Sequence, residues 1–315
     1  MRFHLDHTPE NPGFKLSHQD GLFLIGSCFS NNVGDYLNNY RFNISSNPNG
    51  ILFNPLSISL CFRDILDLKK PDNKLILQRD EIFYSYHHHS SVSGTSPQSL
   101  QETISKKNKE QNEFLKKSAL VIITFGSAYY YYHKSLATAV ANCHKQPGQL
   151  FEKRILSVDE IVTDYSNVIK NLRKLNPNLK VMFTVSPVKY LRDGIIENNL
   201  SKSTLILAVH ELVKNIKDCF YFPAFELVND DLRDYRFYKE DLVHPNNLAI
   251  EYICQKFSDC FFDEQTQQIN LLLEGLNKAL AHRPITNDAS AQLKLREYIQ
   301  KQKTRIKELM PGLTL

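Results

Sequence analysis

The sequence predicts an α/β fold in which helices cover both faces of a doubly wound parallel sheet. Four short apolar runs are rich in β-branched or aromatic residues and lack polar alternation, as expected for buried parallel strands. They span residues 22–25, 120–125, 181–185 and 220–222. Helical patterns lie between them, and this alternation is typical of βαβ units.

The first predicted strand, Leu22–Ile25, stops abruptly at Gly26-Ser27-Cys28. Apolar residues then recur at helical spacing over 29–40, which predicts an amphipathic helix. A strand, a glycine turn and a helix N-terminus together lift a side chain clear of the sheet, beside free N–H groups. We therefore expect Cys28 to be a reactive thiol whose pKa is lowered by the helix N-terminus.

The long span 41–117 separates the first two strands. Its segment 82–86 predicts a short strand, and a pattern near 100–114 predicts a helix. We interpret the rest as inserted loops over the carboxyl edge of the sheet, where the sites of α/β proteins form.

The clearest helical pattern covers 158–172, and Ser157 with Glu160 forms a capping box that fixes its start. A second pattern covers 205–216. A third helix is predicted to follow Pro245, since proline is favourable at a first helical position.

The character of the chain changes after about residue 262. Apolar residues over 269–280 predict one helix, His282-Arg283-Pro284 ends it, and a charged helical pattern follows. We therefore predict an α/β domain over 1–262 and a C-terminal helical extension over 263–315, packed on the domain or on a partner.

The composition is that of an ordinary globular protein, with a net charge of +4. No basic block with interleaved aromatic residues indicates nucleic acid, and no segment reaches the about 20 apolar residues of a membrane span. The six cysteines show no CxxC spacing, and residues 1–7 have no long apolar core. We therefore expect a cytoplasmic protein with reduced thiols, without metal or organic cofactor, and leave a homo-oligomer open.

Asp241 and His244 form the second informative motif, since they stand three residues apart just before a predicted helix. The carboxylate can hold the imidazole tautomer and stabilise its charged form, which leaves the other ring nitrogen as a general base. Taken alone, this spacing is equally well explained by a surface aspartate and a histidine that caps a helix. Downstream of the Gly-Ser-Cys turn, it completes the chain order of one class of hydrolase.

These motifs make the chain similar to the GSCFA family, a branch of the SGNH/GDSL hydrolase superfamily. The eponymous motif is Gly26-Ser27-Cys28-Phe29-Ser30, and the resemblance covers roughly residues 15 to 260. Further matching segments are 49–55, 124–128, 142–145, 186–188 with 192–194, and 233–238. The resemblance implies a flavodoxin-like three-layer sandwich of the SGNH hydrolase type, with loop insertions.

The resemblance also implies roles for individual residues. The superfamily's nucleophilic serine position holds Cys28, with Ser27 beside it as the alternative nucleophile. The terminal Asp-x-x-His block falls on Asp241 and His244, and the oxyanion-binding glycine falls on Gly50.

The superfamily's Gly-x-Asn block falls on Gly126-Ser127-Ala128, so its oxyanion-hole asparagine is missing here. Loss of one such donor typically costs about 2.7–4 kcal/mol of transition-state stabilisation. Another side chain can restore the hydrogen bond. The candidates are Asn142, Asn54, His89 and His144.

The histidine run 87–89 invites the idea of a metal site, but adjacent residues of an extended segment point to opposite faces. We expect only one of the three, His89, to face the site. Cys143 and His144 lack a second pair with zinc-site spacing. A zinc-dependent hydrolase built on His89, His144 and His244 is therefore the least favoured hypothesis.

The favoured hypothesis is an ester hydrolase or acyl transferase acting on a small-molecule or carbohydrate ester, the sugar being an analogy with related SGNH branches. Tyr129–Tyr132 can stack on a sugar ring, although a packed cluster is the favoured interpretation. The alternative function is a catalytically inactive ligand-binding module on the same scaffold, which the missing asparagine and the altered nucleophile favour.

Overall fold

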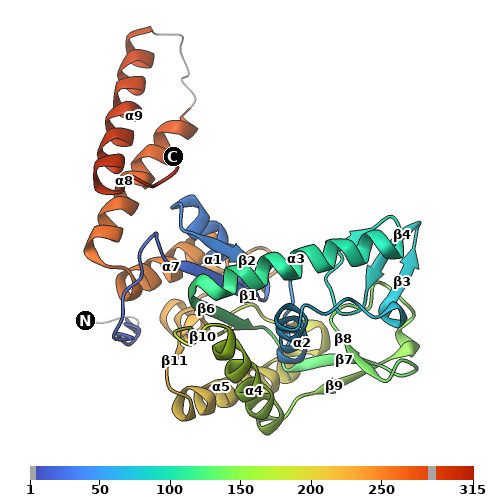
Figure 1. The fold of residues 1–315 in the computed structure, drawn as a ribbon. Coiled ribbons are helices and arrows are strands. Elements are labelled where there is room, and N and C mark those ends of the chain that lie inside the picture. Colours follow the sequence, from blue (N-terminus) through green and yellow to red (C-terminus); the bar gives the residue numbers. More distant parts are fainter. Residues whose placement is uncertain (1–4, 283–288) are drawn as a thin grey trace.

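Five parallel strands form the centre of the structure, a computed structural model that describes residues 5–282 and 289–315 (Figure 1). Their order across the sheet is β11-β10-β6-β1-β2, and all four pairings are parallel. The strands are β1 (Gly21–Gly26), β2 (Ile44–Ser46), β6 (Ser118–Phe125), β10 (Lys180–Val185) and β11 (Cys219–Tyr221). The chain order along the sheet is the flavodoxin-like order, as predicted.

The strand order reverses between β1 and β6. From β1 the chain moves first outward to β2, and later returns to build β6, β10 and β11 on the other side. In open α/β sheets this switch point opens a crevice at the carboxyl ends of the strands. The carboxyl ends of β1 and β6 are therefore where a site is expected.

Helices cover both faces of the sheet, so the predicted three-layer sandwich is confirmed (Figure 1). One face buries a core against α2 (Pro55–Leu66), α4 (Val158–Leu175) and α5 (Ile195–Asn215). The other face packs on α1 (Cys28–Asn39) and α7 (Asn247–Phe261). This burial on both faces explains the continuous apolar runs in the sequence.

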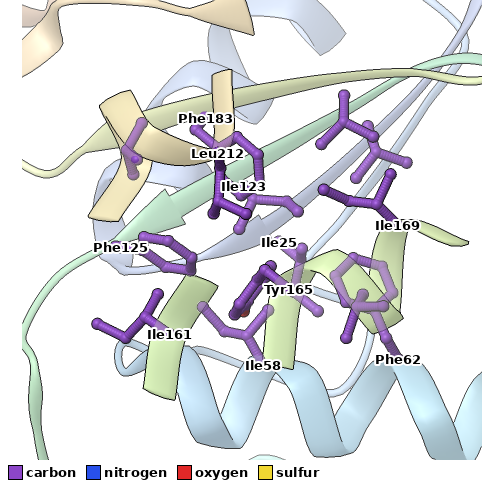
Figure 2. Close-up of a cluster of buried hydrophobic side chains, with 14 of the residues drawn as sticks. Ile25, Ile58, Phe62, Ile123, Phe125, Ile161, Tyr165, Ile169, Phe183 and Leu212 are labelled. Carbon is purple, nitrogen blue, oxygen red and sulfur yellow. The ribbon is translucent and has the colours of Figure 1, made fainter. Parts of the chain in front are cut away.

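Side chains alternate between the two cores along each central strand. In β10, Phe183 enters the core under α4 and α5, whereas its neighbour Met182 enters the core under α1 and α7. Figure 2 shows Phe183 beside Phe125 and Tyr165, with ring centroids 5.7 and 5.8 Å from it. The Tyr165 hydroxyl, fully buried there, donates a hydrogen bond of 2.9 Å to the carbonyl of Pro55.

Several predicted elements are shifted or were missed. The helix after Pro245 starts at Asn247 with Asn246 as its N-cap, so the proline lies before the helix and not at its first position. In the span 41–117 the predicted strand forms over Ile82–Ser85 and the predicted helix is α3 (Pro97–Lys117), whereas β2 and α2 lie where only loops were predicted. The edge strand β2 has only three half-buried residues, two of them serine, and gives little apolar signal.

Two small antiparallel sheets extend the molecule beyond the central sheet (Figure 1). The first consists of β3 (Ile76–Arg79), β4 (Ile82–Ser85) and β5 (Ser93–Gly94). The second consists of β7 (Tyr129–His133), β8 (Thr138–Val140) and β9 (Phe151–Ile155). The tyrosine run lies in β7, where Tyr130 and Tyr131 pack against buried clusters, as the favoured interpretation holds.

The C-terminal region forms two helices, α8 (Glu264–Ala281) and α9 (Ala289–Leu309), which pack on each other and project from the sheet (Figure 1). Their shared core contains Ile269, Leu273 and Ile306. Residues 283 and 284 of the predicted helix break lie outside the described residues. The domain boundary at 262 stays a prediction. Within the described ranges, no helix has the length and apolarity that crossing a membrane requires.

We expect Phe183→Ala to lower the free energy of unfolding by about 3–5 kcal/mol, because it leaves a cavity in a fully buried aromatic cluster. Leu207→Ala is the matched control, since Leu207 is 61% exposed and its truncation should cost less than about 0.5 kcal/mol. Urea unfolding measures both values. Equal losses in the two variants would contradict the placement of Phe183.

Candidate functional site

The site starts from a turn that only glycine can make. Gly26 has a φ of +142°, and a Cβ there would lie 2.2 Å from the carbonyl oxygen of Thr124 in β6. Its N–H donates to Asn47 Oδ1 at 2.8 Å, and the next N–H, of Ser27, donates to the Thr124 carbonyl at 3.1 Å. The end of β1 is thereby fixed against β6, and the chain turns directly into α1.

Ser27 and Cys28 take different positions at this turn. Ser27 is 4% exposed and caps α1, because its Oγ accepts the N–H of Phe29 at 3.2 Å. Cys28 is the first residue of the helix and is partly exposed. The capping role occupies the serine hydroxyl, and this favours Cys28 over Ser27 as the nucleophile.

The predicted acidity of the thiol is wrong in direction. Burial raises the pKa of Cys28 above its ordinary value, because desolvation penalises the thiolate. The backbone N–H groups at the start of α1 and the positive charges of Lys202 and Lys239 lower that pKa, but by less. The helix N-terminus thus acts in the expected sense, and desolvation outweighs it.

Asp241 and His244 form the predicted hydrogen bond, with 2.7 Å between Oδ2 and Nδ1. The other carboxylate oxygen accepts the N–H groups of Val243 and His244, both at 2.9 Å. Those two backbone hydrogen bonds, followed by the one from the imidazole, lower the pKa of Asp241 to about 2. The carboxylate is therefore ionised at neutral pH and holds the ring through Nδ1, which leaves Nε2 without a hydrogen bond among the described residues.

Backbone contacts bring this loop to the carboxyl edge of the sheet. The N–H of Lys189, in the loop after β10, donates to the carbonyl of Val243 at 3.1 Å. The N–H of Lys239 donates to the carbonyl of His244 at 2.7 Å, and the Lys239 ammonium acts electrostatically on the Cys28 thiol. The loop that carries His244 thus lies on the same side of the sheet as Cys28.

Lys202 is a feature of the site that the sequence analysis missed. This residue of α5 is only 2% exposed, and its Nζ donates to the carbonyls of Gly126 and Ser186 at 2.7 and 2.6 Å. Burial lowers the pKa of Lys202 to about 7, and the Cys28 thiol acts in the opposite direction. A signal was present, because Lys202 stands at helical spacing from Leu205 and Val209 on the buried face of α5.

Gly50, the predicted oxyanion donor, and Gly126, the first residue of the Gly-x-Asn block, both use their N–H groups for backbone hydrogen bonds. Gly50 donates to the carbonyl of Asn47 at 2.8 Å in a tight turn, so its predicted role as an oxyanion donor is not supported. Gly126 donates to the carbonyl of Phe53 at 2.7 Å. Ala128 is fully buried, and its N–H donates to Ser201 Oγ at 2.8 Å.

Two of the four replacement donors are occupied elsewhere. The amide of Asn142 donates to Ser90 Oγ at 3.2 Å and accepts the N–H of His144 at 2.8 Å, so it holds a loop together. The buried ring of His144 pairs with the carbonyl of Ser85 at 2.9 Å and stacks on Tyr84. The prediction that either residue holds an oxyanion is therefore not supported.

Asn54 and His89 remain as candidate donors. Asn54 is the N-cap of α2 through its Oδ1, and within the described ranges its Nδ2 makes no hydrogen bond. It follows Phe53, whose carbonyl binds the N–H groups of Gly126 and Ser127 at the end of β6. The His89 ring uses Nδ1 for Ser91 and leaves Nε2 unpaired within the same part of the chain.

The described part of the chain gathers no set of three His, Cys, Asp or Glu side chains that could hold a metal ion. His88 is buried against Ser85, and burial lowers its pKa to about 3. His144 is committed to the contacts given above. The structure therefore offers no ligand set built on His89, His144 and His244.

An aromatic wall lies beside the site, formed by Phe53, Tyr129 and Tyr190. Phe53 stacks on Tyr190 with ring centroids 6.0 Å apart. Phe53 also lies close to Gly126, since a Cβ added to that glycine would be 3.0 Å from the Phe53 Cβ. The ammonium of Lys153 lies 4.2 Å from the ring centroid of Tyr129 and 5.3 Å from that of Tyr190. Lys153 also pairs with Asp193, so the wall has a charged border.

Because the pKa of Lys202 is lowered in the folded protein, the free energy of unfolding should depend on pH. Between pH 7 and about 10.4 the unfolded chain holds the lysine proton and the folded protein has released it, so folding stability contributed by this group rises with pH. Relative to Lys202→Met, the wild type should gain up to about 1.4 kcal/mol per pH unit in this window. Urea unfolding at pH 7 and 9 measures the difference.

Lys214→Met, at an exposed position of the same helix, is the control and should show no such slope. A wild-type advantage that is constant between pH 7 and 9 would mean that Lys202 keeps an ordinary pKa.

The fold is similar to that of several solved structures at low sequence identity. No curated protein matches the chain. Similar solved structures include a carbohydrate esterase family 3 protein from Talaromyces cellulolyticus, with 12% identity, TM-score 0.29 and coverage of 53% of this chain and 65% of that one. Others are a Clostridium thermocellum family 3 carbohydrate esterase (10% identity, TM-score 0.35, 76% and 94% covered) and an acetyl esterase mutant with acetate ion (10%, 0.36, 82% and 99%).

The family comparison covers most of the chain. A model of the GSCFA family matches residues 21–257, a segment that begins at β1 and includes the Gly-Ser-Cys turn, Lys202 and the Asp241–His244 pair. The chain therefore belongs to the GSCFA family.

Proposed function

We propose that the protein is an ester hydrolase or acyl transferase that uses Cys28 as its nucleophile. The observation that carries this proposal is the ionised Asp241 bound to His244 Nδ1, in a loop on the same side of the sheet as Cys28. A nucleophile at a strand–helix turn and an oriented imidazole are the two groups that acyl transfer needs. The carboxyl ends of β1 and β6 lie at the strand switch point, where open α/β sheets usually place their sites.

The reaction proceeds through a thioester. His244 Nε2 accepts the Cys28 proton, and the sulfur forms a bond to the acyl carbon of the ester. The tetrahedral intermediate then collapses, and the alcohol leaves with the proton from His244. Water or an acceptor hydroxyl cleaves the thioester in the second half, again with His244 as the base.

Two donors suit the oxyanion. The N–H of Cys28 stands at the first position of α1, where backbone N–H groups have no intrahelical partner. The Asn54 amide, unpaired at Nδ2 within the described ranges, lies next to the end of β6 and takes the role of the missing asparagine. Ala128 cannot supply a side-chain donor.

A carbohydrate ester suits the wall next to the site. Sugar rings pack on aromatic faces through their C–H groups, and Phe53, Tyr129 and Tyr190 offer such faces beside Gly126. A thiol nucleophile also requires reduced surroundings, which supports the cytoplasm as the compartment.

We expect Cys28→Ala and His244→Ala each to lower kcat/KM by at least about 10³-fold toward acetylated sugars or an aryl acetate, since each removes a group of one reacting unit. Asp241→Asn should lower it by about 10²–10⁴-fold, because the amide no longer holds the imidazole in the tautomer with a basic Nε2 and no longer stabilises its charged form. Steady-state kinetics of the purified variants measures these losses.

Cys143→Ala is the matched control, because Cys143 is the other partly exposed cysteine and lies outside the proposed machinery. It should keep full activity. Activity retained in Cys28→Ala and lost in Ser27→Ala would instead make Ser27 the nucleophile.

The second candidate function is a binding module without turnover. The occupied N–H groups of Gly50 and Gly126, the buried Ala128 and the raised pKa of the Cys28 thiol favour it. Calorimetry with acetylated oligosaccharides separates the two functions. Binding without release of acetate would support the module, whereas release that depends on Cys28 would exclude it.

A further inference from the structure

The interior of the site contains a lysine, Lys202, that has no acidic partner among the described residues. Lys202 Nζ is buried, and the described residues offer it no ion pair with Asp or Glu. Two of its three N–H groups donate to the carbonyls of Gly126 and Ser186, at 2.7 and 2.6 Å. A buried ammonium is costly unless dipoles or an anion compensate its charge, so the two carbonyls supply only part of what it needs.

The position of this ammonium follows from backbone contacts. Gly126 directly follows β6 and lies next to the Gly-Ser-Cys turn, since a Cβ on it would lie 3.3 Å from the Cβ of Ser27. Lys202 therefore binds a carbonyl that lies directly beside the residue preceding Cys28. Its charge and the Cys28 thiol also favour each other's ionised forms.

We propose that Lys202 is a positioning residue of this site, whose buried ammonium is the counter-ion of the Cys28 thiolate. The proposal deepens the proposed function, because it takes Cys28 as the nucleophile. It also explains how a thiol that burial holds in its neutral form can ionise when the substrate is bound. The ammonium cannot be hydrated by bulk water, so its attraction for the thiolate is little screened.

The charge balance of the reaction is consistent with this role. When the S–H bond breaks, the proton moves to His244 Nε2, the electron pair stays on sulfur and Lys202 keeps its three protons. The sulfur then forms the bond to the acyl carbon, and the negative charge moves to the carbonyl oxygen. When the alcohol leaves with the proton of His244, the charges of the site return to their starting values.

The test is the rate at which iodoacetamide alkylates Cys28 between pH 6 and 10, followed by peptide mass spectrometry. Lys202→Met should lower the Cys28 rate at pH 6 at least tenfold, because Lys202 is charged below its pKa of about 7, and the two profiles should converge toward pH 10, where the lysine is neutral. Cys143 in the same sample is an internal reference thiol, and its rate should change less than twofold.

Lys239→Met is the matched comparison, since Lys239 is the other lysine whose charge favours the thiolate, yet its side chain is exposed. Solvent and salt screen an exposed charge, so we expect less than a threefold effect at 0.15 M salt. A folded Lys202→Met variant whose Cys28 profile matches the wild type would overturn the proposal.

A second measurement leaves Lys202 in place and guards against misfolding of its variant. In protein labelled with ¹³C at lysine Cε, NMR titration should show one lysine with a depressed midpoint. Cys28→Ala removes the thiol that raises the pKa of Lys202 and should lower that midpoint by at least half a unit. An unchanged midpoint in Cys28→Ala would overturn the pairing.

The two proposals fail in different ways. A wild type that cleaves no ester, while Lys202→Met still slows alkylation of Cys28, would end the proposed function and leave the counter-ion intact. A Lys202→Met variant that loses ester turnover without any change in the alkylation profile would give Lys202 a merely structural role.

Discussion

The close approach of Gly26 to Thr124 is the constraint on which the rest of the site depends. Any side chain at 26 would collide with the β6 backbone, since a Cβ would lie 2.2 Å from the Thr124 carbonyl oxygen. With glycine, β1 stays in register with β6 to its last residue, the Gly26 N–H donates to Asn47 Oδ1, and the Ser27 N–H donates to the Thr124 carbonyl. Because the turn is fixed on two sides, Cys28 has a defined place at the start of α1.

The sequence predicted the layers well because they follow from burial. Strands covered on both faces must be continuous apolar runs, and the segments 22–25, 120–125 and 181–185 are such runs and lie within β1, β6 and β10. The turn and the Asp241–His244 hydrogen bond were also predictable, because both are local in the chain. The half-buried edge strand β2 and most strands of the small antiparallel sheets carry weaker patterns and were missed, although the segment 82–86 did predict β4.

The polar interior of the site was harder to predict, because it depends on contacts between distant segments. Nothing local in the sequence indicates that the N–H of Gly50 is used by Asn47, or that the ring of His144 is used by Ser85. The acidity of Cys28 depends on how deeply the turn is covered, and this depth is a property of the packed fold. Local features therefore identified the residues, whereas packing decided which of them are free to act.

Burial shifts the pKa values of Cys28 and Lys202 toward their neutral forms, and each group partly offsets the shift of the other. A thiol at a covered strand–helix turn loses hydration, and the helix N-terminus alone does not compensate that loss. Lys202 lies nearby and is also buried, so desolvation favours its neutral form too, by lowering its pKa where it raises that of the thiol. Each group makes the charged form of the other less costly, so ionising both together is easier than ionising either alone. Packing of this kind keeps the thiol neutral at rest and lowers the cost of the thiolate whenever Lys202 is protonated.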